Sequence, residues 1–129
     1  MKLLLDTHIV IWAMVEPDRI PLDVATAITD PANDVYVSAV SAIEVAIKIS
    51  LGKLNLPGPA RSWLLDACTR TGFEWIDITP EDALRLADLP WHHRDPFDRL
   101  LVAQAGRGYT LVTHDRRLAA YSGLSFMWV

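Results

Sequence analysis

Short runs of consecutive apolar residues alternate with longer helical segments, and this alternation restricts the fold more than any other feature of the sequence. The apolar runs predict strands at residues 2–6, 34–38, 73–78, 110–113 and 124–129. The segments between them predict helices at residues 8–16, 22–30, 41–54, 59–72, 79–89, 95–105 and 116–121. Strands that are apolar throughout are buried on both faces. This order therefore predicts a mainly parallel central sheet between helices, a three-layer α/β/α sandwich.

Length and composition indicate one domain. The chain of 129 residues is 51% hydrophobic and no repeat or linker divides it, so we expect residues 1–129 to share one fold. Cys68 is the only cysteine and can form no disulfide within the chain. Asp6 and His8 interrupt the apolar run after Lys2, and no run approaches the roughly 18 apolar residues of a membrane helix. We therefore expect a cytoplasmic protein without membrane association.

Carboxylates stand where the predicted strands end or where the next helices begin. Asp6 ends the first strand, and Asp115 follows the fourth. Glu44 lies one turn into the helix after the second strand, and Asp95 and Asp98 open the helix before the fourth. The carboxyl ends of parallel strands lie on one edge of a sheet, where α/β folds bind ligands. Four separate segments are thus predicted to bring carboxylates to one place.

Each of these acids also has a purely structural interpretation. Ser41 and Glu44 have the spacing of a capping box, and Glu44 and Lys48 have the spacing of a favourable ion pair on one helix face. Asp95 and Asp98 repeat the capping spacing, and the two acids at strand ends would each suit the N-cap of the following helix. For any single acid, capping is at least as good an explanation as chemistry.

Predicted burial favours a bound cation. Glu44 is flanked by Ile43 and Val45, and Asp98 is followed at helical spacing by apolar residues such as Leu101, so neither carboxylate is predicted to face open water. Burying an unpaired charge is costly, whereas one divalent ion satisfies several carboxylates at once. Oxygen ligands without clustered Cys or His select Mg²⁺ or Mn²⁺ rather than Zn²⁺. Such a site predicts chemistry at a phosphodiester, with a metal-activated water as nucleophile.

Four segments resemble, in order and spacing, the motifs of PIN-domain proteins, and specifically of VapC-type toxins of bacterial and archaeal toxin–antitoxin pairs. They are LLLDTH at residues 3–8, SAVSAIEVAIKISLGKL at 38–54, HRDPFDRLLVAQA at 93–105 and LVTHDRRLAAY at 111–121. Each segment alone is weakly specific, whereas all four in this order are specific and span almost the whole chain. The resemblance implies an α/β/α sandwich and a ribonuclease that depends on Mg²⁺ or Mn²⁺.

The resemblance also assigns roles to residues. The catalytic, metal-binding acids of the family correspond to Asp6, Glu44, Asp98 and Asp115. Asp95 matches an additional acid that would ligate metal or support the ligands, and Thr7 and Thr113 match small hydroxyl positions beside the site. After the fourth acid the chain reads RRLAAY, without the further acid that some PIN nucleases carry, so the number of metal ions stays open. The family further implies a homodimer and a cognate antitoxin protein that blocks the active site.

An RNA substrate would need cationic and aromatic contacts around such a site. The net charge of −4 argues against binding a nucleic-acid backbone through overall charge, but two divalent ions would offset it. The residues that we expect to contact RNA are Lys48, Arg94, Arg99, Arg116 and Arg117, together with Trp91, which would stack on a base. For Trp91, packing in the core is an equally good interpretation.

We therefore expect an endoribonuclease toxin that leaves 5′-phosphate and 3′-hydroxyl ends, because water attacks phosphorus. The main alternative is a PIN-fold module that binds RNA or protein without cutting, and intact acids at all four positions count against it. A haloacid-dehalogenase-like phosphatase would need an aspartate where His8 stands. A receiver domain would need a phosphorylatable aspartate at the end of a middle strand, where residues 34–38 end in Ser38.

Overall fold

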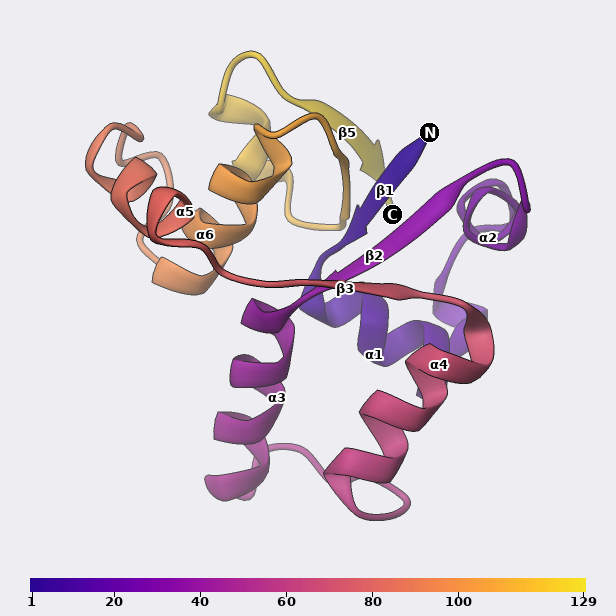
Figure 1. Ribbon diagram of the computed structural model, residues 1–129. Helices are drawn as coiled ribbons and strands as arrows, with labels where there is room; N and C mark the ends of the chain where they lie inside the picture. Colours follow the sequence, from indigo (N-terminus) through magenta and orange to yellow (C-terminus); the bar gives the residue numbers. More distant parts are fainter.

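The computed structural model describes residues 1 to 129 and is built around a five-stranded sheet (Figure 1). The strands lie in the order β3-β2-β1-β4-β5, and every neighbouring pair is parallel. Their bounds are Lys2–Leu5 (β1), Asp34–Ser38 (β2), Glu74–Ile76 (β3), Thr110–Thr113 (β4) and Ser125–Trp128 (β5). All five predicted strands are confirmed, and the first strand of the chain occupies the centre of the sheet.

Helices connect these strands. The α-helices are Thr7–Val15 (α1), Leu22–Thr29 (α2), Ala39–Ser50 (α3), Ala67–Thr71 (α4), Pro80–Leu84 (α5) and Pro96–Ala105 (α6). A π-helical turn at Ser62–Asp66 leads into α4, and 3₁₀ turns occur at Pro17–Arg19, Arg85–Ala87 and Arg116–Ala120. None of the helices combines the length and the apolar composition that a membrane span requires.

The side chains of β1 alternate between two separate cores. Leu3 and Leu5 pack in one core with Val10 of α1, and Leu4 packs in the other with Leu101 of α6. In Figure 1, α1 and α4 accordingly lie on one side of the sheet and α5 and α6 on the other. Because helices cover both faces, the predicted α/β/α sandwich is confirmed.

Some helix boundaries differ from those predicted. The helix expected at residues 59–72 is split between a π-helical turn and α4, and the segment at residues 116–121 forms only a 3₁₀ turn. The helix expected at residues 41–54 begins earlier, because the Ser38 side chain accepts a hydrogen bond of 3.0 Å from the backbone N–H of Val40 and caps α3. The predicted capping box at Ser41 is therefore wrong, since Ser41 lies inside the helix.

Candidate active site and metal centre

The carboxyl ends of β1 and β4, which are neighbours in the sheet, are followed by Asp6 and Asp115. The start of α6 and the first turns of α3 bring Asp98 and Glu44 toward the same edge. A cavity of ≈ 570 Å³ opens at this edge, and no hydrophobic residue lines it. Its lining consists of Asp6, His8, His92, His93, Arg94, Asp95, Asp98, His114, Asp115 and Arg117. The acids predicted to converge do so, with Glu44 just behind the cavity wall.

Asp6 lies buried beside β4 with one carboxylate oxygen bonded and the other unpaired. The hydroxyl of Thr113 donates a hydrogen bond of 2.6 Å to Asp6 Oδ2. Asp6 Oδ1 is buried and has no hydrogen-bond partner. An unpaired buried carboxylate oxygen is costly unless a cation or a donor approaches it. Thr113 therefore fixes the orientation of Asp6 and leaves Oδ1 available as a ligand.

Glu44 is held from α3 by a hydroxyl of α1. Thr7 Oγ1 donates a hydrogen bond of 2.7 Å to Glu44 Oε1 and also lies 2.9 Å from Ser41 Oγ. Burial is the largest influence on Glu44 and raises its pKa, the Thr7 hydrogen bond partly offsets this, and the nearby Asp6 raises it further. The expected ion pair between Glu44 and Lys48 is not formed, so the prediction of that pair is wrong.

Asp98 shows most directly that the acids crowd together. Burial raises the pKa of Asp98 to about 8, and the negative charges of Asp6, Asp95, Glu44 and Asp115 each add to the rise. Like charges within a few ångströms disfavour ionisation of any one member of the group. A divalent cation reverses that balance, because it interacts favourably with all of them at once. The five acids therefore form one electrostatic cluster.

Asp95 is the N-cap of α6, as its spacing predicted. Its Oδ1 accepts hydrogen bonds from the backbone N–H groups of Phe97 at 2.8 Å and Asp98 at 3.4 Å. The return contact of a capping box is absent, because the backbone N–H of Asp95 donates instead to His93 Nδ1 at 3.1 Å. The cap leaves the Asp98 side chain free to face the cavity.

Asp115 is the most heavily bonded acid of the cluster. Arg117 donates to Asp115 Oδ1 from Nε at 2.9 Å and to Oδ2 from Nη2 at 2.7 Å, in a bidentate pair. His93 Nε2 lies 2.9 Å from the same Oδ2. The Arg117 side chain, with a smaller contribution from His93, holds the pKa of Asp115 well below its usual range. Asp115 is therefore ionised and already carries a counter-ion.

His93 has a role that its place in the sequence did not predict. It is only 6% exposed, and its Nε2 lies between Asp115 Oδ2 and Asp98 Oδ2, at 2.9 and 3.3 Å. His93, Asp98 and Asp115 are the one group of three His, Cys, Asp or Glu residues whose ligand atoms all lie within 4.8 Å of one another. The segment HHRDP did not indicate these contacts, because the partners of His93 come from α6 and from the residues after β4.

Other histidines line the wall of the cavity. His8 and His114 pack edge to face with ring centroids 5.0 Å apart, and Trp12 lies 4.9 Å from His114. Burial, followed by the nearby charge of Lys48, lowers the pKa of His8. His8 is therefore neutral near pH 7 and supports the wall.

The residues expected to contact RNA fall into two groups. Arg94 and Arg116 are exposed and Lys48 is half-buried, and Arg94 lines the cavity. Arg99 does not fit the prediction, because it is 3% exposed and its Nη2 donates to the carbonyls of Leu86 and Leu89. We therefore remove Arg99 from the RNA contacts.

Trp91 lies on the surface, so the alternative that it packs in the core is wrong. Its side chain is 73% exposed. The Arg99 guanidinium carbon lies 3.7 Å from the centre of the Trp91 ring. One face of the ring is thus backed by a cation, which holds the ring in place.

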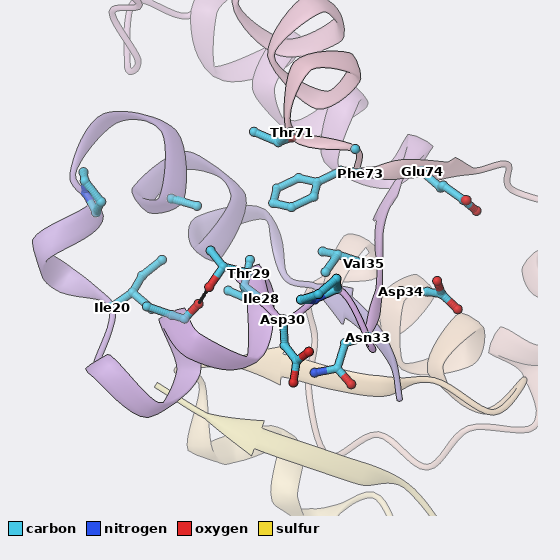
Figure 2. Close-up of a pocket in the computed structure, with 15 residues that line it drawn as sticks. Ile20, Ile28, Thr29, Asp30, Asn33, Asp34, Val35, Thr71, Phe73 and Glu74 are labelled. Carbon is cyan, nitrogen blue, oxygen red and sulfur yellow. Dashed lines mark hydrogen bonds between the residues drawn. The ribbon is translucent and has the colours of Figure 1, made fainter.

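A second cavity, of ≈ 700 Å³, lies at the opposite edge of the sheet (Figure 2). Figure 2 shows Ile20, Ile28 and Phe73 on its walls, with Asp30 and Glu74 toward its rim. Its acids do not form a cluster of converging ligand atoms. Volume alone would favour this cavity, but the chemistry favours the smaller one.

The donor set of the smaller cavity fits a hard divalent cation. Four aspartates line it beside four histidines, and one of these, His93, directs its Nε2 at two of the carboxylates. Asp6 Oδ1 is buried without a partner, and the hydroxyls of Thr7 and Thr113 orient Glu44 and Asp6. Asp6, Glu44 and Asp98 would hold the ion, and Asp115 would join them on release from its counter-ion. This arrangement suits hydrolysis of a phosphate ester by a metal-activated water.

Comparisons with known proteins identify the family of the chain. The family model of the PIN domain matches residues 3–124. Ribonuclease VapC22 of Mycobacterium tuberculosis is 35% identical over 120 residues, which cover 92% of this chain and 90% of that protein. The chain therefore belongs to the PIN-domain family, and the family recognised in the sequence is confirmed.

Solved structures share the fold. VapBC2 from Rickettsia felis, bound to a DNA fragment from its promoter, matches with a TM-score of 0.74 and 18% identity over 98% of each chain. VapBC-5 from Mycobacterium tuberculosis matches with a TM-score of 0.62 and 20% identity over 99% of this chain and 98% of that chain. Both belong to toxin–antitoxin complexes, and their similarity here is one of fold.

Proposed function

We propose that this protein is a VapC-type toxin, an endoribonuclease that hydrolyses RNA with Mg²⁺ or Mn²⁺ in the cytoplasm. The observation that carries the proposal is a cluster of acids at one cavity: Asp6, Asp98 and Asp115 line it, the charge of Glu44 acts on Asp98 beside it, and Asp6 Oδ1 lacks a partner. The relationship to a ribonuclease of the VapC group supports the choice of RNA as substrate.

The four acids would hold the metal, and Asp95 would act from behind as the cap of α6. When bound, the metal would supply an activated water and neutralise charge on the leaving oxygen. Thr113 and Thr7 keep Asp6 and Glu44 in fixed orientations, so little reorganisation accompanies binding. Attack by water on phosphorus, with the ribose 3′-oxygen as the leaving group, would leave a 5′-phosphate and a 3′-hydroxyl.

RNA would be attracted by cations placed around the acidic cavity. Arg94 and Arg117 stand on its wall, and Lys48 and Arg116 lie nearby. Trp91 lies immediately before His92, which lines the cavity, and offers its uncovered ring face to a base. Arg99 contributes indirectly, by holding the Trp91 ring.

We further propose protein partners, namely a cognate antitoxin and a second copy of the chain. Both structural relatives named above come from VapBC complexes. Ile43 and Ile47 of α3 and Leu51, the C-cap residue that follows it, are exposed apolar residues at a spacing of four and form one apolar stripe. A protein partner would remove this stripe from water.

Cleavage of a labelled structured RNA by purified, antitoxin-free protein tests the enzymatic proposal. We expect cutting with Mg²⁺ or Mn²⁺, none with EDTA, and none by Asp98→Asn in any metal. Asp30→Asn, an exposed acid at the opposite sheet edge, is the matched control and should cut normally. Equal activity of Asp98→Asn and wild type would contradict the proposal, and inert proteins that still bind RNA would favour a binding module.

A further inference from the structure

The side chains of His93 and Arg117 both contact the Asp115 carboxylate, and they differ in exposure to solvent. His93 is buried, with its side chain 5% exposed, whereas the Arg117 side chain is 71% exposed. Both contact Asp115 Oδ2, and Arg117 additionally takes Oδ1. Both Asp115 oxygens are therefore engaged, and a metal ion can reach this carboxylate only if a partner gives way.

The proton of His93 is placed by its surroundings. The backbone N–H of Asp95 donates to Nδ1, so Nδ1 carries a lone pair and the neutral ring has its proton on Nε2. This Nε2–H points at Asp115 and Asp98, at 2.9 and 3.3 Å. To ligate metal through Nε2, the ring would have to carry its proton on Nδ1 instead. The Nδ1–H group would then face the backbone N–H of Asp95, and the hydrogen bond between them would be lost. His93 is thus fixed as a donor.

Release of Arg117 is much less costly. Its side chain lies on the surface, where solvent screens the ion pair and water can replace the lost contacts. On release, Arg117 stays on the wall of the acidic cavity, where it can reach an anion. A guanidinium suits two oxygens of a phosphodiester as well as it suits a carboxylate.

We propose that His93 and Arg117 have opposite roles at Asp115. His93 is a positioning residue that holds the Asp98 and Asp115 carboxylates side by side for the metal. Arg117 is an exchangeable counter-ion that leaves Asp115 when metal binds and moves to the RNA phosphate. This inference rests on the metal-dependent function proposed above, and it adds an order of events, since the exchange couples metal binding to substrate binding.

Calorimetric titration of metal-stripped, RNA-free protein with Mn²⁺ separates the two roles, because the two residues should change Mn²⁺ affinity in opposite directions. His93→Ala should weaken Mn²⁺ binding by about 10- to 100-fold, the usual effect of removing a partner that orients a metal ligand. His93→Gln, whose amide can donate at the Nε2 position, should recover most of that loss and guards against a variant that fails to fold. Arg117→Ala should strengthen Mn²⁺ binding by up to about fivefold, the worth of an exposed ion pair.

Matched controls remove a guanidinium or an imidazole from the neighbouring residue. Arg116→Ala deletes the same charge one residue away, from a side chain that packs on Trp128, and should change Mn²⁺ affinity less than Arg117→Ala. His92→Ala deletes an exposed imidazole that lines the same cavity and packs on Tyr121, and should weaken Mn²⁺ binding less than His93→Ala. Equal effects of the two arginine variants would mean that bulk charge alone is at work and would overturn the role of Arg117.

Side-chain ¹H–¹⁵N spectra of His93 test its part directly. We expect a protonated Nε2 and a bare Nδ1, both before and after saturation with Mg²⁺. Transfer of the proton to Nδ1 on metal binding would show that His93 is itself a ligand and would overturn its positioning role. If wild type binds no divalent metal and Asp98→Asn changes nothing, the proposed function fails as well. If wild type binds metal but His93→Ala does not weaken Mn²⁺ binding, or Arg117→Ala does not strengthen it, this inference alone is overturned.

Discussion

Thr113, the last residue of β4, donates a hydrogen bond of 2.6 Å to Asp6, the residue that follows β1. The two residues are buried and belong to neighbouring strands. The bond fixes Asp6 Oδ2 and leaves Oδ1 unpaired toward the site. The sheet thus orients a metal ligand through a single hydroxyl.

Thr113→Val tests this bond, because valine keeps the branched shape and loses the hydroxyl. We expect metal affinity to fall by about 10- to 100-fold, as for other partners that orient metal ligands. Thr113→Ser should restore most of it. Calorimetry with Mn²⁺ measures the effect, and unchanged affinity in Thr113→Val would show that packing alone holds Asp6.

Asp98 gives the metal-free protein a defined pH dependence. Its folded pKa of about 8 lies above the ordinary 3.8, so the folded state holds the proton more tightly than the unfolded state. Its contribution to stability is complete below about pH 4 and is lost as pH rises through about 8. Urea unfolding at several pH values should show this decline, and Asp98→Asn should flatten it. Saturating Mg²⁺ should oppose the decline, because metal binds the ionised form.

Trp91 should bind a single base of the substrate. With the non-cleaving Asp98→Asn protein, Trp91→Ala should weaken binding of single-stranded RNA by about 1–3 kcal/mol, the worth of one base stacked on an aromatic ring. Leu84→Ala, which removes another exposed apolar side chain, serves as control. An abasic nucleotide scanned along the RNA should cost affinity at one position in wild type and nothing there in Trp91→Ala. Additive losses at every position would contradict stacking.

Gln104 joins the sheet to two helices through a buried network. Its Oε1 accepts from the Ser38 hydroxyl, and its Nε2 donates to the carbonyl of Asp77 at 3.3 Å and to Asp82 Oδ2 at 3.4 Å. Gln104→Leu should cost about 1–3 kcal/mol in the free energy of unfolding, because buried polar groups lose their partners. Denaturant titration measures the loss. A neutral result would show that the remaining contact of Asp82 with Arg107 suffices.

The fold and the places of Asp6 and Asp115 were predictable because they depend on periodicity and on strand ends. Continuous apolar runs mark buried parallel strands; Asp6 follows β1 directly, and Asp115 follows β4 after one residue. The cap at Asp95 was equally readable, since it is a local contact. These features need only neighbours in the sequence.

The errors arise where partners are distant in the sequence. Arg99 was expected on the surface because it is charged, but carbonyls of Leu86 and Leu89 and the ring of Trp91 surround it. The contacts of His93 were not predicted because one of its partners, Asp115, lies 22 residues further along the chain. Neither environment leaves a pattern in a short stretch of sequence.

The bond between Thr113 and Asp6 spans 107 positions of the chain. The first strand emerges early from the ribosome, yet its neighbour β4 is made almost at the end of synthesis. The set of acids is therefore incomplete until nearly the whole polypeptide exists and the strands have paired. A chain built in this way has no assembled acid cluster while its own synthesis is still under way.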